Sequence, residues 1–208
     1  MSTSPGPLLQ ALDALWEHLR TQQAELPAAR IAITPTPPPA KHNPERWTRD
    51  GEVVTGLVVS ADTLKEGADA VLEHVLHEAA HVLSWVRGDQ DTTTRGTYHT
   101  GTYLAAAEEV GLRWPPDAPR DPHRGYVSPR LTPETLTTYT ADVRALEQAI
   151  PLVLPHLVIP DAQTAYRPRN RLYLQCGCDD PRRIQMSPRV AARGPVICGV
   201  CEQAFKEA

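Results

Sequence analysis

The chain is poor in aromatic residues and in lysine, and it lacks long apolar runs. Phenylalanine occurs once, at Phe205, and the only lysines are Lys41, Lys65 and Lys206. No apolar run reaches the roughly 18 residues of a transmembrane helix, so we expect no membrane partner. The first residues show neither the basic nor the apolar segment of a signal peptide, which predicts a cytoplasmic protein.

Cysteine is confined to the C-terminal end, in two close pairs: Cys176 with Cys178, and Cys198 with Cys201. Two such pairs, 19 residues apart, are typical of a zinc ribbon, in which four thiolates surround one ion. Disulfides are the weaker alternative because a cytoplasmic setting disfavours them. Four thiolates exclude water, so this zinc should be structural. It should also supply most of the stability of so small a module.

The apolar pattern predicts an α+β protein with a small second domain. It favours helices at residues 8–24, 68–87, 100–110 and 133–150, and strands at 30–34 and 52–60. A proline-rich loop follows at 35–44, and no internal repeat is present. We therefore expect a domain at 1–150, a linker at 151–170 and the zinc ribbon at 171–208.

The segment His77-Glu-Ala-Ala-His81 carries the strongest chemical signal. Two histidines four residues apart lie one turn apart on one helix face, so both can bind one metal ion. Glu78, beside the first histidine, is placed to deprotonate water, as in the HExxH zinc peptidases. The surrounding apolar spacing predicts an amphipathic helix without Gly or Pro from Ala68 to Arg87. The alternative is a core helix that carries two ordinary histidines.

A catalytic zinc needs a third protein ligand and an open position. His99 follows a polar loop at the entrance of the next predicted helix, from which it can fold back onto the first two histidines. Glu108 or Glu109 is the rival, although adjacent glutamates are more often a solvated helix face. His74 is expected at the surface or behind the ligands, and His123 lies in a predicted loop.

Four segments together resemble the SprT-like zinc metallopeptidases, and most closely the SprT-like proteins of actinobacteria and their mobile elements. They are Leu76-His-Glu-Ala-Ala-His81, Arg87-Gly-Asp-Gln-Asp91-Thr-Thr, Gly96-Thr-Tyr-His99 and Leu104 to Leu112. The resemblance spans residues 50–150 and extends to the cysteine tail. It implies an HExxH zincin-like domain with a catalytic zinc on His77, His81 and His99 and with Glu78 as base. The family has His-Gly where this chain has His99-Thr100-Gly101.

The resemblance also implies a function: a zinc-dependent endopeptidase that acts on DNA-bound or DNA-crosslinked proteins. Zinc would lower the pKa of a water and polarise the peptide carbonyl, while Glu78 takes the proton and returns it to the leaving amine. Tyr98 or Tyr126 would donate to the oxyanion. Two alternatives share these motifs: a peptidase that cleaves a repressor of a mobile element, and a non-catalytic zinc protein that binds nucleic acid.

Charge is unevenly distributed along the chain. Residues 165–208 hold eight basic and four acidic side chains, a balance of +4, whereas the whole chain has −4 and the remainder therefore −8. A basic tail on an acidic body suggests that the tail meets single-stranded or duplex DNA or another polyanion. A merely solvated basic surface explains the same numbers.

Overall fold

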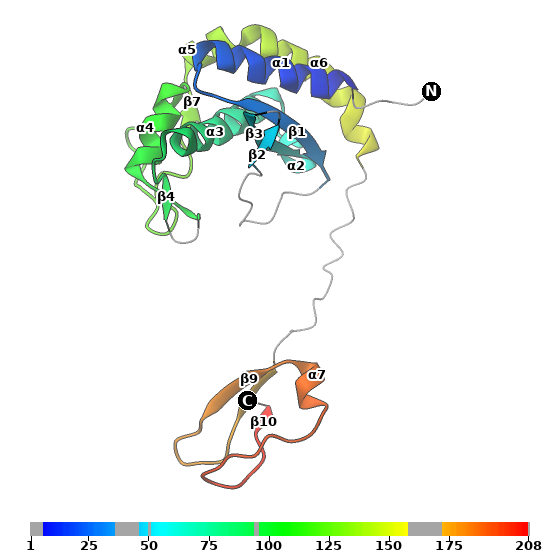
Figure 1. Ribbon diagram of the computed structural model, residues 1–208, viewed down its shortest axis with the longest axis vertical. Helices are drawn as coiled ribbons and strands as arrows, with labels where there is room; N and C mark the ends of the chain where they lie inside the picture. The colour runs from blue at the N-terminus through cyan, green and yellow to red at the C-terminus, as the bar shows by residue number, and fades with distance from the viewer. Residues whose placement is uncertain (1–5, 36–45, 50, 94–95, 158–171, 208) are drawn as a thin grey trace. The chain divides into compact units, whose positions relative to one another are not determined.

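The computed structural model describes residues 6–35, 46–49, 51–93, 96–157 and 172–207. The chain forms two compact units, Met1–Ile159 and Pro160–Ala208, each of which is considered by itself (Figure 1). Helices and small sheets together give a mixed α+β architecture, as predicted. None of the helices in the described ranges is long and apolar enough to span a bilayer.

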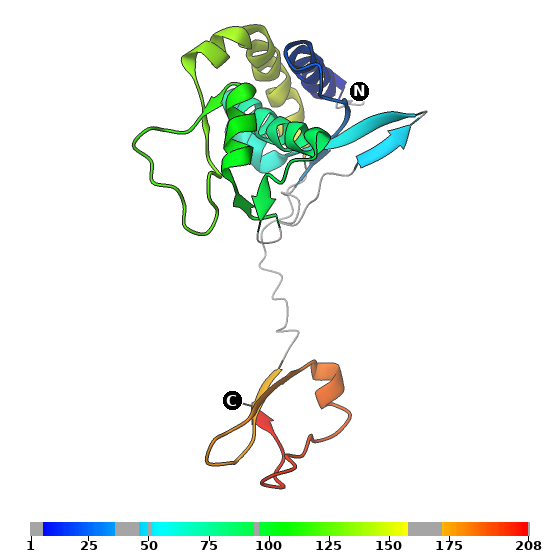
Figure 2. The same cartoon turned by 60° about the vertical axis from the view of Figure 1, so that its left-hand side comes forward.

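A three-stranded sheet lies on one side of the N-terminal unit. Strand β1 (Ala28–Thr34) runs parallel to β3 (Glu52–Ser60), and β2 (Arg46–Arg49) pairs with the other edge of β3 in antiparallel register. Figure 2 shows β2 and β3 extending together away from the helices. The sequence analysis missed β2, because a four-residue segment with two arginines is recognisable as a strand only through its pairing with β3.

Helix α3 (Ala68–Arg87) is the central helix of the unit and has the predicted bounds. It begins after Gly67 (φ +99) and ends at Gly88, whose left-handed conformation suits glycine. Ser60 accepts a hydrogen bond from the Thr63 N–H and caps the short α2 (Ala61–Lys65), which precedes α3. The strand β3 therefore leads into α3 through one additional helical turn.

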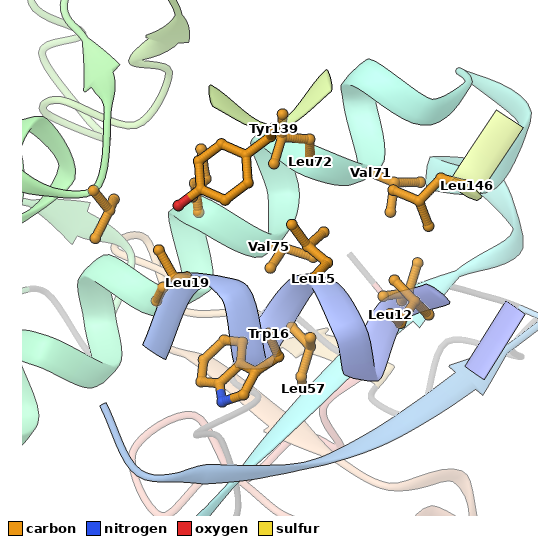
Figure 3. Close-up of a cluster of buried hydrophobic side chains, with 14 of the residues drawn as sticks. Leu12, Leu15, Trp16, Leu19, Leu57, Val71, Leu72, Val75, Tyr139 and Leu146 are labelled. Carbon is orange, nitrogen blue, oxygen red and sulfur yellow. The ribbon is translucent and has the colours of Figure 1, made fainter. Parts of the chain in front are cut away.

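Leucine-rich helices pack around α3 and the sheet. Helix α1 (Gly6–Gln22) turns Leu12, Leu15 and Leu19 inward, and these side chains meet α3 residues such as Val75 (Figure 3). Each such leucine contributes about 1.5–3 kcal/mol when it leaves water. This core holds α3 fixed, and with it the two histidines of its opposite face.

The helix predicted at 133–150 is two helices, α5 (Pro133–Thr138) and α6 (Thr140–Val153). Helix α6 continues through Pro151 because Val153, only 7% exposed, reaches the core, and a 3-10 turn follows at Leu154–His156. The expected linker start at residue 151 is therefore too early. The rest of that linker, from residue 158, and residues 36–45 of the predicted proline-rich loop lie outside the described residues.

Short elements connect α3 to the rest of the unit. Strands β4 (Thr92–Thr93) and β5 (Tyr98–His99) form a small hairpin where a polar loop was expected. Helix α4 (Gly101–Glu109) follows, and β6 (Leu112–Arg113) pairs with β7 (Arg130–Leu131). The hairpin returns the chain to α3, which allows a histidine at its end to meet the helix.

The C-terminal unit has little apolar interior. Strands β8 (Leu172–Gln175), β9 (Arg183–Met186) and β10 (Lys206–Glu207) form an antiparallel sheet in the order β10-β8-β9, with a short α7 at Pro188–Ala191. Among its described hydrophobic residues, only Leu174, Cys176 and Cys198 are buried. So small a core cannot stabilise about 40 residues without a crosslink or a metal.

Candidate metal centres

The three histidines predicted as zinc ligands come together in the N-terminal unit. The Nε2 atom of His81 lies 3.3 Å from that of His77 and 3.1 Å from that of His99. Tetrahedral zinc with Zn–N distances of about 2.0–2.1 Å places its ligand nitrogens about 3.3 Å apart. The ligand atoms all lie within 4.8 Å of one another, so this donor set fits zinc.

Backbone contacts place His99 against α3. Its N–H donates to the Arg124 carbonyl at 2.9 Å, and its own carbonyl accepts from the Tyr126 N–H at 3.1 Å. Gly125, between these two residues, has φ +66, and a Cβ there would lie 2.0 Å from the His99 carbonyl oxygen. Only glycine permits so close an approach. Strand β5 is thus held between β4 and the 124–126 segment.

Two polar side chains orient His81 and His77 through contacts to Nδ1, the ring nitrogen that does not face the other histidines. His81 Nδ1 lies 2.6 Å from an Asp91 carboxylate oxygen, and His77 Nδ1 lies 2.5 Å from the Tyr103 hydroxyl. With each Nδ1 donating, each Nε2 presents its lone pair to the common point. His99 Nδ1 is buried and has no hydrogen-bond partner among the described residues. Coordination of one metal ion at the three Nε2 atoms would account for the orientations of all three imidazoles.

Burial and neighbouring charge keep the imidazoles of His77 and His99 neutral. Burial, followed by repulsion from His81, lowers the pKa of His77 well below its usual value and that of His99 to about 4. Burial opposes ionisation of Asp91, but the hydrogen bond and the charge attraction to His81, with further hydrogen bonds, together outweigh burial and lower the pKa of the carboxyl. Metal binding requires neutral imidazole, so His77 and His99 offer free lone pairs at neutral pH.

Glu78 and His77 line the same cavity, whose volume is about 280 Å³. The opposite wall comes from the loop that includes Val127 and Arg130. His74 also lines this cavity, and its Nε2–H donates to the Val58 carbonyl at 2.8 Å. His74 is therefore part of the cavity wall and is bonded to β3, as expected for a residue outside the ligand set.

The rival third ligands lie elsewhere. Glu109 forms an ion pair with Arg87 at 2.9 Å, and Arg87 also pairs with Glu25 at 2.7 Å. Glu108 is exposed on α4, and His123 is exposed in its loop. Within the described ranges, the ligand atoms that gather in threes or more belong to the three histidines and to the four cysteines.

Two residues of the histidine site escaped the sequence analysis: Tyr103, which was assigned to the core, and Asp91, which was given no role. Tyr103 lies four residues after His99, in the first turn of α4, and Asp91 precedes β4, so closeness to His99 in the sequence was the available signal. Tyr126, expected to serve the oxyanion, packs its ring edge-on against Trp114 at 5.2 Å. The oxyanion role of Tyr98 or Tyr126 stays a prediction.

The four cysteines form the second cluster, in the C-terminal unit. All four Sγ atoms lie within 4.8 Å of one another, and none forms a disulfide. Cys178 and Cys198 are 3.7 Å apart at Sγ, close to the roughly 3.8 Å expected for tetrahedral zinc with Zn–S bonds of about 2.3 Å. The donor set therefore fits a four-thiolate zinc site.

Each cysteine pair lies in a tight turn whose N–H groups face sulfur or carbonyl oxygen. The Arg182 N–H donates to Cys176 Sγ at 3.2 Å, and the Cys198 N–H donates to the Gln203 carbonyl at 2.9 Å. The Arg182 guanidinium also reaches Cys198 Sγ at 2.6 Å. The Cys201 backbone N–H, more than any other group, lowers the pKa of Cys198 to about 5, and Arg182 adds to this effect. Such donors stabilise thiolates, the form that binds zinc.

Comparison of the chain with protein-family models, with curated proteins and with solved structures gives no match. The resemblance to SprT-like peptidases therefore stays a prediction, which rests on the motif residues of this chain.

Proposed function

We propose that the N-terminal unit is a zinc-dependent endopeptidase of the SprT-like, zincin type. The observation that carries the proposal is the convergence of His77, His81 and His99 at Nε2 beside a cavity that Glu78 also lines. Three protein ligands leave one position of tetrahedral zinc open, which is the arrangement of catalytic rather than structural sites. The four cysteines, by contrast, complete their own coordination and serve the fold.

The roles of the side chains follow from their positions. When bound, zinc would supply Lewis-acid chemistry, which lowers the pKa of a water molecule and polarises a carbonyl. Glu78 takes a proton from the attacking water as the C–O bond forms, and it delivers that proton to the amine nitrogen as the C–N bond breaks. Asp91 and Tyr103 hold the imidazoles in the orientation that this geometry needs.

We further propose that the substrates are proteins bound or crosslinked to DNA, and that the C-terminal unit contacts the DNA. Its positive balance supports this assignment. Arg183 is exposed at a hollow of about 440 Å³, which Ile197 and Phe205 also line. A cation beside apolar and aromatic side chains suits unpaired bases and their phosphates.

The test of the peptidase uses zinc-loaded protein and an unfolded protein substrate. Glu78→Gln should retain wild-type zinc content, because Glu78 is not a ligand, while hydrolysis should fall by about a hundredfold or more. Zinc is measured by elemental analysis, and cleavage by the appearance of new N-termini. Undiminished cleavage by this variant would remove Glu78 from the mechanism.

A second pair of variants tests the third ligand. His99→Ala should lose the zinc of the N-terminal unit and the activity, whereas Glu109→Ala should keep both, since Glu109 pairs with Arg87. The reverse result would make the helical glutamate the ligand.

A further inference from the structure

The cavity beside His77 and Glu78 extends well beyond the two residues that the chemistry uses. One side of α3 supplies positions separated by three, four, seven and eight residues, namely Ala70, Glu73, His74, His77 and Glu78. This spacing places all five on one helix face. Glu66, at the end of α2, also lines the cavity and is exposed. A groove therefore runs along α3, from His77 toward the N-terminus of the helix.

The opposite wall of the cavity, residues 127–130, is held by polar contacts at both ends. Arg130 pairs with Glu73 at 2.8 Å, and the Leu131 N–H donates to the other Glu73 oxygen at 3.3 Å. At the other end, the Tyr126 N–H donates to the carbonyl of His99. The wall between residues 127 and 130 is thus tied both to α3 and to a predicted zinc ligand. A pocket held in this way is largely preformed, as ligand sites usually are.

The size and the charge of the cavity select its occupant. Ala70 leaves room that a longer side chain on the helix would fill, and about 280 Å³ accommodates a long side chain. Glu66, Glu73 and Glu78 supply three carboxylates, while Arg130 supplies one positive charge that is already paired with Glu73. The pocket therefore carries excess negative charge. An ammonium or guanidinium on a flexible aliphatic stem fits such a pocket, with its stem along Ala70.

We propose that this cavity is the subsite for a substrate side chain next to the scissile bond, and that it selects lysine or arginine. The inference rests on the proposed peptidase function. Ala70 sets the length of side chain that is accepted, and Glu66 sets its charge. Neither residue belongs to the metal centre, so both can be changed without removing a ligand or the base.

The experiment begins with zinc-loaded wild-type enzyme and an unfolded protein, with the cleavage sites read by mass spectrometry. Basic residues should be enriched at one fixed position relative to the cut. Two peptides that differ only there, lysine against glutamate, should then differ in kcat/KM by about tenfold in favour of lysine. If wild type cleaves nothing, the peptidase proposal fails and the subsite fails with it. Cleavage without a basic preference overturns the subsite alone.

Two variants with matched controls test the assignment of residues. Ala70→Leu should lower kcat/KM for the lysine peptide by about tenfold, with little effect on a peptide that has alanine there. Ala105→Leu, at an exposed site of α4, should change neither. Glu66→Lys should abolish the lysine preference, and Glu147→Lys on α6 should preserve it. Zinc content and thermal unfolding verify that each variant is folded. Unchanged selectivity in both cavity variants would overturn the proposal.

Discussion

Tyr103 contacts all three histidines of the proposed zinc site. Its ring centroid lies 4.5 Å from that of His99, 4.6 Å from that of His81 and 5.1 Å from that of His77. The side chain is fully buried, and burial raises the pKa of its hydroxyl, which therefore stays protonated. A neutral phenol oxygen can accept a hydrogen bond from the Nδ1–H group of His77 without adding charge to the site. Tyr103 is thus a positioning residue for the metal ligands.

We expect Tyr103→Phe to weaken zinc binding in the N-terminal unit by about tenfold, within the range known for partners behind metal ligands. The ring and its packing remain, so the loss isolates the hydroxyl. Zinc affinity is measured by competition with a chelator. Tyr139→Phe is the matched control, because Tyr139 is also buried but packs at a tilt against His18. An unchanged affinity in Tyr103→Phe would show that the hydroxyl does not orient His77.

Residues whose roles follow from local spacing were predictable, and others were not. His77 and His81 follow from helical geometry, and His99 follows from its place at a helix entrance. Tyr103 belongs to the same helix face as core residues, so periodicity alone assigns it to packing. Its contact with His77 depends on how α4 crosses α3, which no local pattern specifies.

At the scale of elements, the predictable helices and strands are those with a long, uninterrupted pattern of apolar residues. Helix α3 has twenty residues and a glycine at each border, and both of its predicted ends agree with the structure. Strand β2 and the β4–β5 hairpin were missed because strands of two to four residues depend on their partners. The break between α5 and α6 was missed because apolar spacing continues across Tyr139. Pairing and packing between distant segments decide such cases.

The C-terminal unit gives a prediction at this scale, since its sheet and turns surround the four sulfurs. Intact protein should hold about two zinc ions per chain, and replacing Cys198 and Cys201 with serine should leave about one. The C-terminal unit should then become sensitive to proteolysis, because its buried apolar residues are few. Elemental analysis and limited proteolysis measure the two effects. A single zinc in the intact protein would contradict the assignment of two centres.

For the whole molecule, charge is unevenly divided between two parts of the chain. The acidic N-terminal part, at −8, repels phosphate, whereas residues 165–208 carry +4. This division could be predicted from the sequence alone, because it depends only on the order of the charged residues along the chain. We therefore expect any contact with DNA in the part without the three histidines of the proposed zinc site. Arg182 is engaged with Cys198, which makes Arg183 the better probe of phosphate binding.

Deleting residues 165–208 should leave the histidine zinc in place but reduce cleavage of a DNA-bound protein. With four or five arginines on phosphate, full-length protein should lose about 50- to 130-fold in affinity for single-stranded DNA between 50 and 200 mM salt. Arg183→Gln should lower both affinity and salt slope, whereas Arg144→Gln, exposed on α6, should change neither. Cleavage is compared for truncated and full-length enzyme on one substrate, with and without DNA. If DNA stimulates both equally, the C-terminal unit does not recruit DNA, and recognition of protein becomes its better assignment.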